Sequence, residues 1–265
     1  MTLDHDDLGY PVPLARAPRR VVSLVPSLTE AIVRSAAGIL VGATEWCVHP
    51  AALDVPRVRG TKNPHIARIR ELAPDLVIAN EEENRRRDVE ALRAAGVPVW
   101  VTVVSSVDSA LQSLERLLAV LEAPDREWLG QARHAWAAHP PGRPTRHTAV
   151  VAIWRRPWMW LGRDTYAGDV LARLGVANAL GDGGTDGERY PRVDPADLPA
   201  HDLVVLPDEP YAFNADDGPE QFPGERIMLV DGQALTWYGP RMIDTPAVVS
   251  RALTAASPGG SANRE

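Results

Sequence analysis

Cysteine and long apolar runs are scarce in this chain. Its 265 residues include a single cysteine, Cys47, so no disulfide can form within the chain. No stretch approaches the about 18 consecutive apolar residues that a membrane-spanning helix needs, which predicts that the protein does not insert into a membrane. A basic stripe is also missing: 28 Lys and Arg stand against 35 Asp and Glu, and the net charge of −7 argues against nucleic acid as a partner.

Catalytic signatures are missing as well. The sequence contains no Gly-x-Ser-x-Gly elbow, no Gly-rich phosphate loop and no HExxH motif, which favours a binding protein over an enzyme. An alternative stays open, because His49, Glu82, Asp208 and Arg241 are residue types that carry acid–base chemistry when they face one another. That alternative is a cytosolic enzyme of a chelatase-like or tetrapyrrole-modifying kind.

The first 20 residues lack the cationic start and the apolar stretch of about 7–15 residues that a secretory signal contains. We therefore expect a cytoplasmic protein. A periplasmic or extracellular lipoprotein is the alternative if the true start lies upstream.

Short apolar runs alternate with helical patterns along the rest of the chain. Apolar residues on both faces of such runs predict parallel strands covered by helices. The predicted strands are 20–25, 39–44, 76–80 and 97–103 in the first half and 148–154, 203–207 and 226–232 in the second. The predicted crossover helices are 26–35, with Ser27 and Glu30 at capping-box spacing, and 82–95, with Asn80 as the cap of Glu81, Glu82 and Glu83.

Between the two sets of strands, leucines recur every three or four residues from Val107 onward, and a second helical stretch runs from Asp125 to Ala138. We therefore predict an α/β protein with two lobes, each built on a mainly parallel sheet and joined by a long helical connector. The expected segments are a flexible N-terminus (1–19), a first lobe (20–106), the connector (107–140), a second lobe (141–253) and a disordered tail (254–265).

The segments RRVVSLVPSLTEAI, GATEWCVHP and ELAPDLVIANEEENRRRDVEALRAAGVPVW resemble the helical-backbone class of periplasmic binding proteins, and the resemblance continues to WYGPR. Members of that family capture cobalamin, ferric siderophores, haem or metal ions for ABC transporters. The resemblance implies a non-catalytic ligand-binding protein whose small-molecule ligand lies in the cleft between the lobes. It leaves the cofactor unknown, with cobalamin or another metal chelate as the candidate ligand.

Two departures from the family pattern bear on its partners. Transporter-coupled members use a surface glutamate on each lobe to pair with arginines of the permease, and the matching positions here are Ala67 and Ala196, the latter beside Asp197. Loss of both charges disfavours an ABC permease as a partner. Thr61 and Asn80 replace loop aromatics of the cobalamin binder, which disfavours cobalamin itself.

Aromatic and charged side chains gather where the predicted strands end, and ligands of open α/β sheets bind beyond those ends. Aromatic faces there can stack on a planar or macrocyclic ligand or enclose a cation. A place in the core can explain any one of them but is a poorer explanation for the whole group. The predicted ligand contacts are Trp46, His49, Glu82, Trp154, Trp158, Tyr166, Asp208, Tyr211, Trp237, Tyr238 and Arg241. Cys47 and His49 are the only candidate metal ligands, and two ligands do not make a metal site.

Overall fold

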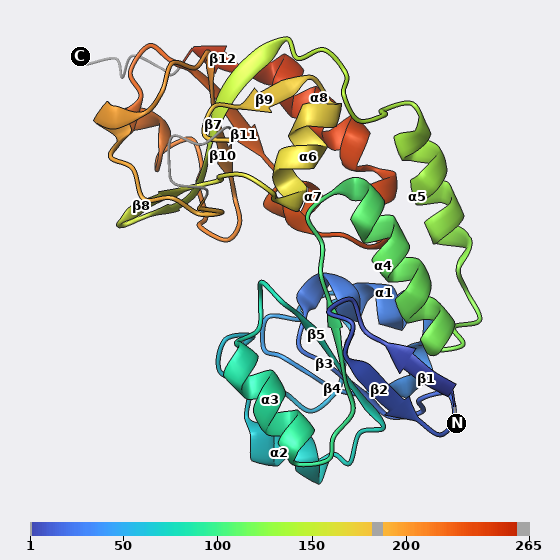
Figure 1. Cartoon of the computed structure of the whole chain (residues 1–265). Helices are drawn as coiled ribbons and strands as arrows, with labels where there is room; N and C mark the ends of the chain where they lie inside the picture. Colours follow the sequence, from blue (N-terminus) through green and yellow to red (C-terminus); the bar gives the residue numbers. More distant parts are fainter. Residues whose placement is uncertain (1, 182–187, 259–265) are drawn as a thin grey trace. The chain divides into compact units, whose positions relative to one another are not determined.

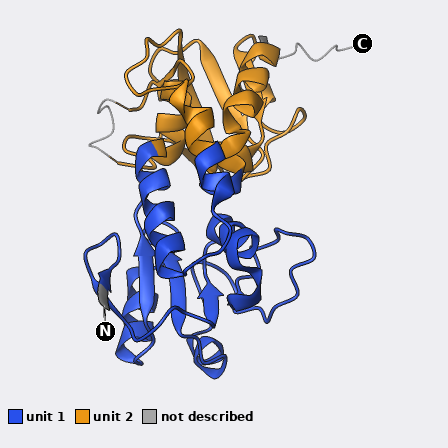
Figure 2. Ribbon diagram, turned by 90° about the vertical axis from the view of Figure 1, so that its right-hand side faces the viewer, with its two compact units in different colours: residues 1–104, 108–131, 238–240 blue, residues 105–107, 132–237, 241–265 orange. Residues whose placement is uncertain are grey.

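The computed structural model describes residues 2–181 and 188–258, whose elements are shown in Figure 1 and whose two compact units are shown in Figure 2. Unit 1 contains residues 1–104, 108–131 and 238–240, and unit 2 contains residues 105–107, 132–237 and 241–265. Each unit has its own sheet and its own hydrophobic core. The predicted α/β fold class with two sheets is confirmed.

The sheet of unit 1 has four parallel strands in the order β4-β3-β5-β6. They are β3 (Val21–Ser23), β4 (Leu40–Ala43), β5 (Leu76–Asn80) and β6 (Val99–Thr102). Every residue of β5 is buried, which explains why this central strand is apolar without alternation. One face of the sheet packs a core that includes Leu24, Val77, Leu92 and Val101.

Four helices and one 3-10 turn belong wholly or mainly to unit 1: α1 (Pro26–Ala36), η1 (Ala37–Ile39), α2 (Ile66–Glu71), α3 (Arg86–Ala94) and α4 (Val107–Val120). Helix α1 begins at Pro26, whose fixed φ suits the first helical position. Because the helix starts there, Ser27 lies inside its first turn, Val25 is the N-cap, and the predicted capping box does not form.

The N-terminal segment, expected to be flexible, instead forms an antiparallel hairpin of β1 (Thr2–His5) and β2 (Pro11–Leu14). The carboxylate of Asp6, in the loop between them, is buried and accepts bonds from the backbone N–H of Tyr10 at 2.8 Å and from Arg93 at 2.6 Å. A buried carboxylate needs such partners, and they hold the hairpin in place. Polar sequence at a terminus therefore misled the prediction.

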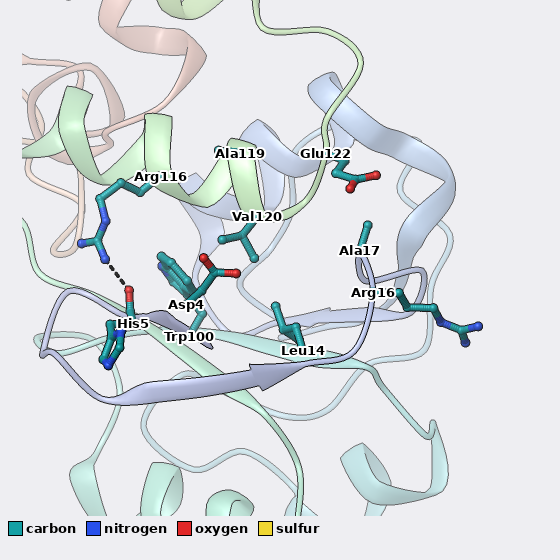
Figure 3. A pocket seen from close by; sticks show the side chains of 10 residues that line it. All are labelled: Asp4, His5, Leu14, Arg16, Ala17, Trp100, Arg116, Ala119, Val120 and Glu122. Atoms are coloured by element: carbon teal, nitrogen blue, oxygen red, sulfur yellow. Dashed lines mark hydrogen bonds between the residues drawn. The ribbon is translucent and has the colours of Figure 1, made fainter. Parts of the chain in front are cut away.

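A hollow of about 440 Å³ lies between this hairpin and α4 (Figure 3). Arg116 of α4 reaches across to donate to the backbone carbonyl of His5, and it also pairs with Asp7. Its guanidinium lies 5.4 Å from the centroid of the Trp100 ring. Because Arg116 fastens the hairpin to the helix and the lining includes none of the predicted ligand contacts, we assign this hollow to the fold.

The sheet of unit 2 has a parallel centre and antiparallel edges. Strands β7 (His147–Arg155), β9 (Val176–Asn178), β10 (Leu203–Pro207) and β11 (Arg226–Val230) are parallel, while β8 (Trp158–Trp160) pairs antiparallel with β7 and β12 (Ser257–Pro258) with β11. Part of the tail expected to be disordered is thus helix end and strand, and residues 259–265 lie outside the described residues.

The unit boundary crosses two further helical segments, α5 (Glu127–Ala137) and η4 (Pro240–Ile243). The remaining segments belong to unit 2: α6 (Tyr166–Arg173), η2 (Pro195–Asp197), η3 (Pro219–Gln221), α7 (Gly232–Thr236) and α8 (Thr245–Ala255). Buried tryptophans fix α5. Trp128 donates its indole N–H to the hydroxyl of Ser35 at 2.8 Å, and Trp136 donates to the carbonyl of Met242 at 3.0 Å. Within residues 2–181 and 188–258, no helix is long and apolar enough to span a bilayer.

Candidate functional site

The carboxyl ends of the strands in unit 1 carry one group of the candidate site residues. The chain leaves β3 toward β4 on one side and later returns to β5 on the other side, so β3 and β5 flank a topological switch point. Ligands of open α/β sheets bind outside such a point. Two loops follow the strands there, Glu45 to His49 after β4 and Glu81 to Asn84 after β5.

The loop after β5 is locked by two asparagines. Asn80 accepts the backbone N–H of Glu82 at 2.9 Å and of Glu83 at 3.1 Å, and its amide donates to the carbonyl of Thr102 at 3.0 Å. Asn84 accepts the backbone N–H of Asn80 at 2.8 Å. Helix α3 begins only at Arg86, so Asn80 caps a turn and not the helix that the sequence predicted over 82–95. The local Asn bonds compete successfully with helix formation.

Glu83 in this loop is an acid whose pKa lies far from its ordinary value. Its pKa is raised to about 7, first by burial and then by the neighbouring carboxylate of Glu82, while the ammonium of Lys62 opposes the shift. The same ammonium donates to the backbone carbonyl of Glu82. A carboxyl group with this pKa exchanges a proton near neutral pH and can donate or accept a hydrogen bond to a ligand.

Tyr238 lies against this loop as part of unit 1. Its ring is buried, and burial followed by the charge of Glu83 raises the pKa of its hydroxyl well above the usual value. Hydrogen bonds to the side chains of Thr102 and Ser27 act in the opposite direction and lower the pKa. The backbone of Gly239 lies close to helix α1, since an added Cβ would meet the carbonyl oxygen of Ser27 at 3.2 Å. Tyr238 is therefore a neutral hydroxyl held beside an acid of adjustable charge.

The loop after β4 presents one exposed aromatic and one enclosed thiol. Trp46 is 66% exposed and lies over Gly60, whose added Cβ would approach the indole nitrogen to 3.1 Å. Cys47 is fully buried, and its sulfur lies 3.0 Å from the hydroxyl of Thr29 and 3.1 Å from that of Thr44. Burial raises the pKa of this thiol, which makes it a structural residue. His49 is half-buried beside it.

No group of three or more His, Cys, Asp and Glu in the described part of the chain is arranged to hold a metal ion. The pair of Cys47 and His49 gains no further ligand.

In unit 2 the carboxyl ends of β7 and β10 carry an aromatic cluster. Trp158 stacks on Trp160 at a centroid distance of 5.3 Å and on Phe213 at 5.9 Å, so the predicted contact Trp158 uses its ring faces within the protein. Trp154 is 42% exposed and meets the ring of Tyr211 edge-on at 5.4 Å. Of these predicted contacts, Trp154 keeps the most surface for a ligand.

Arg155 anchors this cluster. It pairs with Asp217 and Glu220 and lies 5.8 Å from the centroid of the Trp158 ring. The hydroxyl of Tyr211 donates to Asp217 at 2.6 Å. These ion pairs and hydrogen bonds hold the aromatic rings in fixed positions, which lowers the entropy lost when a ligand packs on them.

Three further predicted contacts differ in their surroundings. Asp208 is exposed and accepts the backbone N–H of Gly232 at 2.7 Å, at the start of α7. The guanidinium of Arg241 lies 5.2 Å from the centroid of the Trp237 ring, and both residues are half-buried. Tyr166 is buried at the first position of α6, where burial followed by the charge of Asp169 raises the pKa of its hydroxyl. Tyr166 packs inside the unit.

The structure thus brings together Glu82 with Tyr238, Trp154 with Tyr211, and Trp237 with Arg241. The sequence analysis did not identify Glu83 as the acid with the shifted pKa. It also missed Lys62, whose charge opposes that shift and which lies about 20 residues before the glutamates in the sequence. The signal available for Glu83 was its place beside two other acids after a buried strand, and three adjacent glutamates look alike until their burial is known.

No protein-family model matches the sequence. The vitamin B12-binding protein of Pectobacterium atrosepticum is 23% identical over 176 residues, which span 62% of this chain and 63% of that protein. The vitamin B12-binding protein of Pectobacterium carotovorum subsp. carotovorum is 22% identical, over 92% of this chain and 91% of that protein.

Two solved structures match nearly the whole chain. The periplasmic vitamin B12-binding protein of Vibrio cholerae has a TM-score of 0.68 and 20% identity, covering 90% of this chain and 97% of its own. A periplasmic heme-binding protein in complex with two hemes has a TM-score of 0.69 and 22% identity, covering 90% and 98%. The chain has the periplasmic-binding-protein fold. These neighbours are named as binding proteins rather than enzymes.

The comparisons also correct the expected location. The matched solved proteins are periplasmic, so the assignment of this chain to the cytoplasm is wrong. It relied on the composition of the first 20 residues, which carries less weight than similarity along the rest of the chain.

Proposed function

We propose that this protein binds a metal-bound macrocycle of the cobalamin or heme type and releases it chemically unchanged. The relatives and solved neighbours are named for vitamin B12 and for heme, two ligands that share a flat ring around a metal ion. The observation that carries the proposal in this chain is Trp46, an indole 66% exposed at the carboxyl edge of a parallel sheet. Large exposed aromatics at that edge offer a stacking surface for such a ring.

Within unit 1 the neighbouring groups supply polarity. Glu83 accepts or donates a hydrogen bond according to its protonation, and the hydroxyl of Tyr238 stays neutral beside it. A macrocycle with polar or charged substituents would place them here, while Trp46 contacts the ring. The predicted contacts Trp154, Trp237 and Arg241 in unit 2 remain part of the proposal.

The test is a fluorescence titration of the purified chain with cyanocobalamin and with hemin, combined with native mass spectrometry. The proposal expects saturable quenching and a one-to-one mass shift for one of the two ligands. Replacing Trp46 by alanine should weaken that ligand about tenfold or more, because hot-spot aromatics contribute about 2 kcal/mol or more. Tyr10→Ala removes another exposed aromatic of unit 1 and serves as the matched control. Equal affinities of the two variants, or no binding of either macrocycle, would overturn the proposal.

A catalytic role for the same residues is the second candidate, and the neutral-range pKa of Glu83 is the observation in its favour. Mass spectrometry of the released ligand separates the two. A binder returns the ligand with its original mass, whereas an enzyme changes the mass during incubation in proportion to time.

We also propose that docking to a permease, if the protein serves one, does not use the two acidic anchors of the family. Ala67 lies exposed on α2 and Ala196 lies exposed in η2, so neither position offers a carboxylate. Installing both with Ala67→Glu and Ala196→Glu should strengthen association with a family permease in a salt-sensitive way, since such pairs act through charge. Unchanged association would show that other contacts decide docking.

A further inference from the structure

A basic hollow lies at the amino-terminal edge of the sheet in unit 2, the opposite edge from the candidate ligand residues. Its volume is about 350 Å³, and Gly175, Leu174 and Leu253 form part of its wall. His147 is the first residue of β7 and Arg226 the first residue of β11, and both strands run parallel. Figure 1 shows this end of the sheet beside α6 and α8. We name it the basic pocket: Arg143, Arg146, His147 and Arg226.

The side chains of the basic pocket have the opposite sign of charge to the chain as a whole. All four defining side chains are basic types and none of the lining residues is acidic, whereas the chain as a whole has a net charge of −7. One acid lies at its margin: the carboxylate of Asp202 is 3.7 Å from the ring nitrogen Nδ1 of His147. Such a concentration of one sign in a concave surface attracts ions of the opposite sign.

Helix capping explains one of these arginines but not the others. Arg226 donates to the carbonyl of Leu253 at 2.9 Å and to that of Ala256 at 3.3 Å, which satisfies the carboxyl end of α8. This fixes the position of its guanidinium, which also lies 3.5 Å from Nδ1 of His147. The imidazole nitrogen can accept a hydrogen bond from this guanidinium.

Arg146 has no structural partner of this kind. Its backbone N–H donates to the carbonyl of Gly175 at 2.7 Å, while its exposed guanidinium has no hydrogen bond or ion pair among the described residues. Arg143 is exposed too and reaches the carbonyl of Ala138 only at 3.4 Å, with His139 at 2.9 Å. Donors of both guanidinium groups are therefore available at a pocket whose other arginine is already oriented.

We propose that the basic pocket binds a phosphate group, either as inorganic phosphate or as part of a small phosphate ester. A guanidinium presents paired N–H donors that match the oxygens of phosphate. Several basic groups and no acid in the lining favour a dianion over a single carboxylate. The pocket is separate from the proposed macrocycle site, since it lies at the other edge of the unit 2 sheet.

The test is isothermal titration of the full chain with inorganic phosphate and with glycerol phosphate, repeated on Arg146→Ala and Arg143→Ala. Both arginines are exposed, so both variants should fold, which thermal unfolding verifies. Arg192→Ala removes an exposed arginine of unit 2 outside the pocket and is the matched control. We expect saturable binding that weakens about tenfold or more in each pocket variant, as loss of a charge-assisted contact predicts, and remains in Arg192→Ala.

Tighter binding of glycerol phosphate would identify an ester as the ligand class, and equal or tighter binding of inorganic phosphate would identify the free ion. The proposal is overturned if neither compound binds saturably. It is also overturned if the Arg192→Ala variant loses as much affinity as the two pocket variants, because the effect would then reflect net charge alone.

Discussion

Replacing Glu83 by glutamine should make the protein more stable at neutral and alkaline pH. The folded-state pKa of Glu83 is raised from 4.5 to about 7, chiefly by burial. The unfolded chain therefore releases this proton at lower pH than the folded protein does, and the contribution of Glu83 to stability falls as pH rises from about 4.5 through 7. Each pKa unit corresponds to about 1.4 kcal/mol, so the full shift amounts to about 3 kcal/mol above pH 8. Since part of the side chain is accessible, we expect about 1–3 kcal/mol.

Urea unfolding followed by tryptophan fluorescence measures this at pH 4, 5, 6, 7 and 8, values that bracket the shift from 4.5 to about 7. The stability difference between Glu83→Gln and the parent should increase in favour of the variant across that range. Glu81→Gln removes an exposed carboxylate two positions away and should show no such increase. Lys62→Met removes the charge that opposes the shift, so its stability should fall more steeply with pH than that of the parent. A difference that does not change with pH in Glu83→Gln would refute the reasoning.

Two other expectations follow from the packing. Cys47 is fully buried and burial raises the pKa of its thiol, so a thiol reagent should label it only when the protein is unfolded; labelling of the native protein at the rate of a free cysteine would contradict this. Gly162→Ala should lower the free energy of unfolding by about 1–3 kcal/mol, because an added Cβ would lie 2.1 Å from the carbonyl oxygen of Glu188. Gly130 has open space around it, so Gly130→Ala should be neutral or stabilising in the same urea measurement.

The strands of the fold were predictable because burial on both faces leaves a direct trace in the sequence. The predicted segments 76–80 and 203–207 coincide with β5 and β10, in which every residue is buried. The other predicted strands overlap β3, β4, β6, β7 and β11. A short, continuous apolar run between two helical patterns is typical of a central strand in a parallel sheet, because helices cover both of its faces.

Segments held by polar contacts were not predictable in the same way. The hairpin of β1 and β2 depends on Asp6, whose partner Arg93 is 87 positions away. The start of α3 depends on the side chain of Asn80, which accepts the backbone N–H groups of Glu82 and Glu83 and so stabilises a turn in place of the first helical turn. The partner of Asp6 comes near only in the folded chain, so local pattern carries no record of that contact. The bonds of Asn80 are local, and the same residue type suits both the cap of a helix and the start of a turn, so the pattern did not decide between them.

The candidate site illustrates the same limit at the level of single side chains. Three adjacent glutamates follow β5, and sequence reasoning selected Glu82 among them as the ligand contact. The fold gives each of them a different environment. Glu81 is exposed, and the backbone carbonyl of Glu82 accepts a hydrogen bond from the ammonium of Lys62. Glu83 has a pKa of about 7 and lies beside the hydroxyl of Tyr238. A carboxyl group with a pKa near 7 can gain or lose its proton when a ligand binds, at a small cost in free energy. Among the three glutamates, Glu83 is therefore the one whose substitution should change ligand affinity in a pH-dependent way.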